Sequence, residues 1–297
     1  MKKLLLIGAI CAVLGASRGG ALENAVEQLP LIKKDAGAVR VLGIGNSFTV
    51  DALNPFLHEL AAAAGREIIV AHLVIGGATL DEHADNAQKN TAAYQYTKIG
   101  LDGAASSTAN VSIADAIVDE EWDIVCFQQQ SWLSGQFDSY QPYLPALVDH
   151  VKSKSRNPET VYAILQTWAF ADDYSMDDYE YYDNSQTTMY GSLVEAAEKA
   201  SDLIAPKMSV IPAGTAIQNA RTSVLGDTFC ADGYHLHPAR GRFTVACVWY
   251  DAIFGISAVD NPYISPGLPD AEAAIAKKAA HYAIQRPREV TNLAGDR

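Results

Sequence analysis

The sequence predicts an α/β fold in which a central parallel sheet lies between two layers of helices. Short apolar runs alternate with stretches of helical periodicity, and this pattern favours parallel strands joined by helices that cover both faces of one sheet. The roughly 275 residues after the N-terminal leader are enough for one large core. No Pro/Ser-rich linker, charge block or repeat divides residues 21–297. We therefore expect one domain with the architecture of a three-layer α/β/α sandwich.

The expected strands and helices follow one another along the chain. Strands are expected at residues 39–45, 67–75, 123–129, 160–166 and 208–213. Helices are expected near residues 53–64, 112–121, 141–154, 184–205, 214–224 and 238–254, with an alanine-rich closing helix at 270–286. Right-handed crossovers would place the ends of the first and third strands at a topological switch point, where a cleft forms.

Two polar segments interrupt this repeat, at residues 79–111 and 169–184. Long connections in a compact domain tend to be functional, so we expect these two to shape access to a ligand. The second segment is dense in Asp and Tyr. Its tyrosines fit a sugar-binding role and a packed loop equally well, since aromatic rings serve both.

Residues 1–20 have the pattern of an exported bacterial signal peptide. Lys2 and Lys3 precede an apolar run at 4–14, and small residues follow near Ser17 and Ala21. The run is too short for an ordinary membrane span. We expect cleavage, no stable membrane insertion of the product, and a secreted or periplasmic location. A retained N-terminal anchor is the alternative.

Charge and cysteine content limit the possible partners. The chain has 22 Lys and Arg against 35 Asp and Glu, a formal net charge of -13, which argues against nucleic acid because basic residues supply most of that affinity. Cys126, in an apolar strand, and Cys247, in an apolar helix, are expected as buried thiols, although Cys230 could pair with one of them in an oxidising compartment. No metal-ligand spacing is present, and no metal or organic cofactor is expected.

A serine, an aspartate and a histidine form the candidate catalytic set. Ser47 lies two residues after the end of the first predicted strand, and Asp232 and His235 lie three residues apart before an apolar helical stretch. A serine hydroxyl needs an imidazole to accept its proton, and the imidazole needs a carboxylate to orient it. His237, beside Pro238, is expected to be structural, at the start of the following helix.

Further residues complete the candidate site. An oxyanion hole needs donors where negative charge develops, and four sources are proposed: the amide of Ser47, Gly77 after the second strand, then Gln129 and, as second choice, Gln128. Candidate substrate-binding residues are Asn46, Ser131 and Trp168, the last at the end of the fourth strand. Arg240 and Arg242 are expected to form surface salt bridges.

These blocks resemble those of a known superfamily. Gly45-Asn46-Ser47, Gly77, the strand-end amides and Asp232-x-x-His235 are similar to the serine, glycine, amide and histidine blocks of the SGNH (GDSL-like) hydrolases. In finer detail, residues 44–49, 128–131, 166–169 and 232–236 are similar to the DUF4886 family. The resemblance implies a flavodoxin-like α/β/α fold and ester hydrolysis, often removal of acetyl groups from carbohydrate. The implied partner is a small-molecule or glycan ester.

The chain departs from the superfamily pattern at two blocks. Asn46 stands where aspartate usually precedes the serine, and the third block offers glutamines, with Trp132 in place of the asparagine. The leading hypothesis is a secreted serine esterase that acts through an acyl-enzyme. The alternatives are a carbohydrate-binding protein with weak catalysis on the same scaffold and an O-acyltransferase that uses the same residues.

Overall fold

The computed structural model describes residues 30–32 and 37–295, and the predicted signal peptide lies outside them. Within these residues the chain forms one seven-stranded sheet with the strand order β4-β3-β2-β1-β5-β6-β7. The strands are β1 (Val39–Gly45), β2 (Ile68–Val74), β3 (Tyr94–Ile99), β4 (Ala105–Val111), β5 (Ile124–Phe127), β6 (Val161–Leu165) and β7 (Ser209–Ile211).

The sheet is parallel except at one edge. β1 pairs in parallel with β2 and β5, and β6 and β7 continue the parallel part. The five parallel strands are the five predicted ones, in flavodoxin-like order, so β1 and β5 flank the switch point. The predicted fold class is confirmed.

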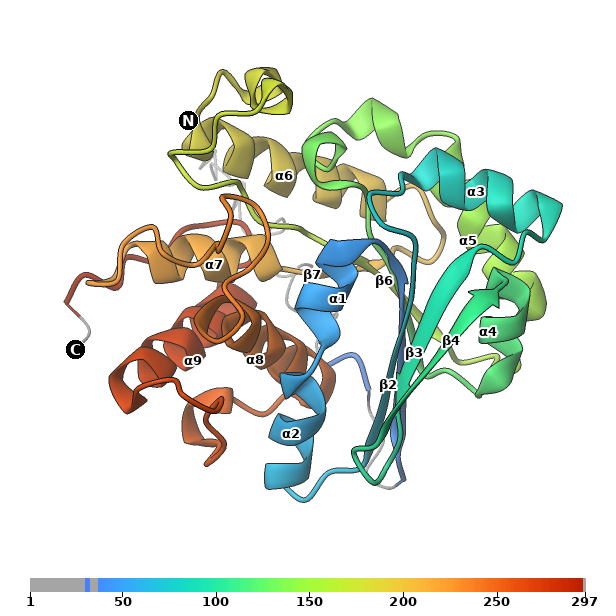
Figure 1. Ribbon diagram of the computed structural model, residues 1–297, viewed down its shortest axis with the longest axis horizontal. Helices are drawn as coiled ribbons and strands as arrows, with labels where there is room; N and C mark the ends of the chain where they lie inside the picture. The colour runs from blue at the N-terminus through green and yellow to red at the C-terminus, as the bar shows by residue number, and fades with distance from the viewer. Residues whose placement is uncertain (1–29, 33–36, 296–297) are drawn as a thin grey trace, which may run out of the picture.

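Helices cover both faces of the sheet (Figure 1). They are α1 (Ser47–Leu53), α2 (Phe56–Ala63), α3 (Leu80–Lys89), α4 (Ile113–Asp119), α5 (Tyr143–Lys154), α6 (Gln186–Ser201), α7 (Ala213–Arg221), α8 (Arg240–Phe254) and α9 (Asp270–Gln285). α2, α8 and α9 lie on one side of the sheet, and α3, α4 and α5 lie on the other.

Alternate residues of the central strands fill two separate cores. Val41 and Val70 face the layer of α1, α2 and α8, whereas Leu42 and Ala71 face the layer of α3, α4 and α5. Successive side chains of a strand point to opposite faces, so a strand covered on both sides must be apolar throughout. This explains the continuous apolar runs of β1 and β2.

The segment at 79–111 is not the long excursion that we expected from its polar sequence. It forms α3 and an antiparallel hairpin, β3 and β4, that widens the sheet beyond β2. Residues 105–110 of β4 are all exposed, because this strand lies at the sheet edge with one neighbour. An exposed edge strand needs no apolar alternation, which is why its Ser, Thr and Asn residues gave no strand signal.

The three cysteines of the described residues are unpaired. Cys126, Cys230 and Cys247 are free thiols, and Cys126 and Cys247 are buried as predicted. Burial raises the pKa of Cys230 to about 12, which makes its thiolate scarce at neutral pH.

Among the described residues, none of the helices combines the length and the apolar character needed to cross a bilayer.

Candidate active site

The turn between β1 and α1 presents Ser47 at the carboxyl end of the sheet. The side-chain oxygen of Asn46 accepts a hydrogen bond from the Phe48 amide at 3.0 Å and caps α1. A Cβ on Gly45 would collide with the Thr49 hydroxyl and the Gln128 carboxamide, so the turn requires glycine there. Because Asn46 is the N-cap, Ser47 is the first residue of α1. The amide of a first helical residue has no acceptor within the helix.

A short loop brings the other two candidate residues to Ser47. The loop is closed as a hairpin, with the Ala231 amide donating to the His235 carbonyl and the His237 amide donating to the Phe229 carbonyl, both at 2.8 Å. Ser47 Oγ lies 2.9 Å from His235 Nε2, and His235 Nδ1 lies 2.8 Å from Asp232 Oδ2. The structure thus brings Ser47 into contact with His235, which lies 188 residues further along the chain, and places Asp232 on the other side of the His235 ring.

The electrostatics of the loop keep Asp232 ionised. Burial raises the pKa of Asp232, but hydrogen bonds from the His235 ring and from the amides of His235 and Tyr234 outweigh it, so the pKa lies below its ordinary value. An ionised Asp232 favours the tautomer of the neutral imidazole in which Nδ1 carries the proton and donates it to the carboxylate. In that tautomer Nε2 is the acceptor that faces the Ser47 hydroxyl.

Aromatic rings hold this arrangement in place. Phe48, next to Ser47, stacks on Trp168 with ring centroids 4.4 Å apart and packs edge-on against His235 at 5.7 Å. The Trp168 indole N–H donates to the Tyr234 carbonyl at 2.7 Å, and the Tyr234 ring lies 4.0 Å from the His235 ring. The imidazole is therefore packed between neighbours of both chain segments.

Asp51 provides a second link between the two segments, which the sequence did not suggest to us. It lies one helical turn after Ser47, and its Oδ2 accepts the amide of Leu236 at 2.8 Å, while Oδ1 pairs with Arg242 at 2.6 Å. Burial raises the pKa of Asp51 despite the nearby Arg242 guanidinium. A carboxylate inside an otherwise apolar helical stretch was the available signal for this residue.

The two backbone amides predicted as oxyanion donors, those of Ser47 and Gly77, lie in turns that contact each other. Ser47 N begins α1, and Gly77 lies in the turn that follows β2 with φ at +70°. The Asn46 carboxamide donates to the Ala78 carbonyl at 3.0 Å, and Ile75 N donates to the Gly45 carbonyl at 3.3 Å. These bonds hold the Gly77 turn against the Ser47 turn. Within the described residues, no protein acceptor is found for either amide.

The two glutamines do not offer donors to this site, which corrects the predicted oxyanion role of Gln129 and Gln128. Both are buried. The Gln129 carboxamide donates to Ser139, and that of Gln128 donates to the Gln129 carbonyl. The Gln128 oxygen accepts the amide of Asn46 at 3.0 Å. Gln128 thus holds the Ser47 turn, whereas the Gln129 oxygen accepts the amide of Leu80 at the start of α3 at 3.0 Å. Strand-end polarity alone could not distinguish these structural roles from a catalytic one.

The predicted substrate-binding residues also have different roles. Asn46 is 2% exposed and both ends of its carboxamide are hydrogen-bonded within the protein. Trp168 is fully buried, and Ser131 is 4% exposed. None of the three offers a substantial surface to a substrate, because the fold itself uses the polar groups of Asn46 and Trp168. The predictions for Asn46 and Trp168 are therefore wrong, and the burial of Ser131 leaves it little surface for a substrate.

The residues that we expected to be structural are structural in the described fold. His237 Nδ1 accepts the amides of Ala239 and Arg240 at 3.2 and 3.4 Å, at the start of α8. Arg240 pairs with Glu272 at 3.2 Å, and Arg242 with Asp51. Asp51 is buried, so the Arg242–Asp51 pair is not the surface salt bridge that we predicted for Arg242.

The fold and this site define a class: an α/β/α sandwich with a Ser-His-Asp arrangement at the switch point of its parallel sheet. The chain belongs to the DUF4886 family, "Domain of unknown function (DUF4886)", whose model matches residues 40–283. The predicted resemblance to this family is confirmed. A search of curated proteins found no match.

Solved structures of similar fold include a DUF4886 family protein from Bacteroides uniformis. It is 41% identical, with a TM-score of 0.86, and the match covers 88% of this chain and 100% of that one. A proposed SGNH hydrolase from Slackia heliotrinireducens is 20% identical, with a TM-score of 0.46 over 73% of this chain and 100% of that chain. A variant of an acetyl xylan esterase from Geobacillus stearothermophilus is 14% identical, with a TM-score of 0.47 over 73% and 94%.

Proposed function

We propose that this protein is a serine esterase that removes acetyl or other short acyl groups from carbohydrate through an acyl-enzyme. The observation that carries the proposal is the continuous line from Ser47 Oγ through the His235 ring to Asp232, with contacts of 2.9 and 2.8 Å. A hydroxyl, an imidazole and a carboxylate in this order are the parts that nucleophilic acyl transfer needs.

The first half of the reaction forms the acyl-enzyme. His235 Nε2 accepts the Ser47 proton as Oγ attacks the ester carbonyl carbon, and the Asp232 carboxylate stabilises the resulting imidazolium. The amides of Ser47 and Gly77 donate to the carbonyl oxygen as it becomes negative. One such donor contributes roughly 3 kcal/mol to lowering the barrier. The imidazolium then protonates the departing alcohol oxygen of the sugar.

The second half releases the acyl group. Water takes the place of the alcohol, His235 removes one of its protons, and the water oxygen attacks the acyl carbon. The Ser47 oxygen leaves and recovers its proton from His235. All proton transfers pass through one imidazole nitrogen, so no second acid or base is needed.

A pair of serine variants tests this proposal. Ser47→Ala is expected to abolish hydrolysis of an aryl acetate while the circular dichroism spectrum stays unchanged. Ser257→Ala is a matched control, because Ser257 Oγ also lies 3.0 Å from a histidine, His281. Asp251 lies 3.8 Å from the same nitrogen, His281 Nδ1, that Ser257 contacts. The serine and the aspartate therefore do not lie at opposite nitrogens of the imidazole, as they do at His235. Full activity in Ser47→Ala would refute the proposal.

We also propose that the protein acts outside the cytoplasm, as a secreted or periplasmic product. The support is the charged, apolar and small-residue order of residues 1–20. N-terminal sequencing of protein from the periplasm and culture fluid of a bacterial host tests it. A start near residues 18–22 is expected, and protein that keeps Met1 would contradict it.

A further inference from the structure

A pocket of 780 Å³ lies between the turn that carries Trp132 and the Asp- and Tyr-rich segment. Its lining residues are Trp132, Ser175, Met176, Asp177, Asp178, Glu180 and Tyr181. Trp132 belongs to the short helix η2 (Ser131–Leu133), and four of the others belong to η4 (Asp177–Tyr182). We propose that this pocket binds the sugar chain of an uncharged acylated glycan and excludes anionic glycans. The proposal rests on the esterase function proposed above.

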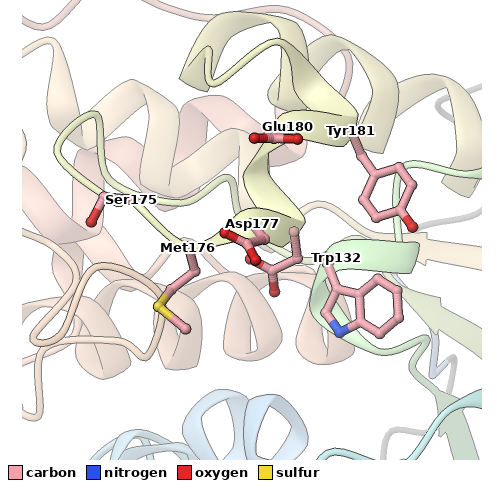
Figure 2. Close-up of a pocket in the computed structure, with 7 residues that line it drawn as sticks. Trp132, Ser175, Met176, Asp177, Glu180 and Tyr181 are labelled. Carbon is pink, nitrogen blue, oxygen red and sulfur yellow. The ribbon is translucent and has the colours of Figure 1, made fainter.

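Two aromatic rings give the pocket a platform for a sugar ring. The rings of Trp132 and Tyr181 have centroids 6.0 Å apart and planes only 17° apart, and Figure 2 shows them next to each other with their faces turned the same way. Tyr181 is 62% exposed, so much of its ring packs against no other part of the protein and is open to solvent. A flat apolar face of a pyranose would cover it favourably.

Carboxylates surround this platform without a basic partner among the lining residues. Asp177, Asp178 and Glu180 line the pocket, and no Lys, Arg or His does. Oδ1 of Asp178 is buried and accepts no hydrogen bond within the described residues. Ionised carboxylates are acceptors only, so they match the hydroxyl donors of a sugar. In the part of the chain that the structure describes, no three such side chains converge as a metal site.

The same charges set the selectivity of the pocket. Residues 169–184 contain six acidic residues, Asp172, Asp173, Asp177, Asp178, Glu180 and Asp183, and no Lys or Arg. A cleft lined by one sign of charge repels ligands of that sign. A chain of uronates would meet this field, whereas an uncharged oligosaccharide would not. The ligand class is therefore a neutral glycan.

Both walls of the pocket are attached to the candidate active site. On one side, the Ala171 amide donates to the Gly233 carbonyl at 2.7 Å, and the Tyr174 ring packs on Tyr234 at 5.7 Å, next to His235. On the other side, η2 follows the strand end where Gln128 binds the Asn46 amide. The pocket walls are thus held against the two chain segments that carry Ser47 and His235, and this is the reason to expect that one glycan contacts both the pocket and Ser47.

Kinetics on two substrate sizes separate the pocket from the chemistry. For Trp132→Ala and Tyr181→Ala, we expect KM for acetylated neutral oligosaccharides (cello-, xylo- and manno-) to rise about tenfold, with kcat/KM for an aryl acetate within about twofold. Tyr143→Ala is the control, because Tyr143 is exposed on α5 and lies outside the lining. Unchanged KM in both pocket variants, with the aryl acetate still hydrolysed, would overturn the pocket proposal and leave the esterase proposal standing.

Direct binding tests the pocket without any turnover. Calorimetry on Ser47→Ala is expected to detect the same oligosaccharides without acetyl groups, and Tyr181→Ala in that background is expected to weaken the binding about tenfold. No binding of any neutral oligosaccharide, or tighter binding of a polyamine, would overturn the proposal whether or not the wild type is an esterase.

A charge variant tests the selectivity. The wild type is expected to prefer acetylated neutral oligosaccharides over acetylated oligogalacturonides, and Asp177→Asn with Glu180→Gln is expected to narrow that preference. The narrowing should be largest at low salt, where exposed charges are least screened. Equal kcat/KM for the two substrates in the wild type would contradict the proposed exclusion.

Discussion

At the scale of single residues, the sequence predicts which catalytic side chains meet better than it predicts the role of each polar residue around them. Two remote motifs predict that Ser47 and His235 act together, and the structure brings their reacting atoms to 2.9 Å. Polar groups at strand ends gather near ligands, and this pattern predicts site roles for Asn46, Gln128 and Gln129. Each instead uses its amide within the fold. A sequence does not show which buried amide has found a partner, so this part could not be predicted.

Asp232 gives the residue-scale prediction. Asp232→Asn keeps the shape of the side chain but removes the charge that stabilises the imidazolium and selects the tautomer. We expect kcat for an aryl acetate to fall by roughly 10³- to 10⁴-fold with little change in KM.

Asp173→Asn is the matched control, since it removes an exposed carboxylate of the polar segment and is expected to leave kcat unchanged. A kcat for Asp232→Asn close to that of the wild type would show that the carboxylate has no part in the proton path.

At the scale of elements, apolar periodicity predicted the strands that have helices on both faces. It missed β3 and β4, because a hairpin at the sheet edge can be polar on its outer strand. It also did not reveal how α1 is joined to the loop of His235. That link depends on Asp51, whose carboxylate contacts Leu236 and Arg242 from the helix that begins at Ser47.

Asp51 gives the element-scale prediction. Asp51→Ala removes the acceptor of the Leu236 amide and leaves Arg242 unpaired, so we expect a loss of roughly 3 kcal/mol in the free energy of unfolding. Because the loop also loses its tether beside His235, kcat is expected to fall about ten- to a hundredfold. Urea unfolding and aryl acetate kinetics measure the two effects.

A double variant separates positioning from stability. Arg242→Ala in the Asp51→Ala background removes the unpaired charge and is expected to restore much of the stability but not kcat. Recovery of kcat together with stability would mean that Asp51 acts on the fold alone.

At the scale of the whole molecule, the alternation of strands and helices was sufficient to predict the layers and the switch point. Strand order then places the ends of β1 and β5 side by side, and Ser47 follows β1 at that point. The sequence predicts that residues 169–184 shape access to a ligand, but it does not predict which residues line the pocket, because both walls come from connections without regular periodicity.

Stability of the whole molecule should depend on the buried Asp251. Burial raises the pKa of Asp251 to about 7, although the Ala258 amide donates to it at 2.6 Å. Below that pH the folded protein binds a proton that the unfolded chain, with its ordinary pKa near 3.8, does not bind. The free energy of unfolding is therefore expected to gain about 1.4 kcal/mol from this group between pH 8 and pH 6.

Asp251→Asn isolates this contribution. Urea unfolding at pH 8 and at pH 6 measures it, and the variant is expected to lack the gain that the wild type shows. An equal pH dependence in both proteins would show that Asp251 is ionised throughout this range.

The central claim, that Ser47 forms a covalent acyl intermediate with help from His235, is tested most directly by mass spectrometry. Protein mixed with an aryl acetate and quenched in acid is expected to carry one acetyl group on the peptide that contains Ser47. That adduct is expected to be absent in His235→Ala. An acetyl group on another residue, or rapid turnover with no dependence on Ser47 or His235, would contradict the account.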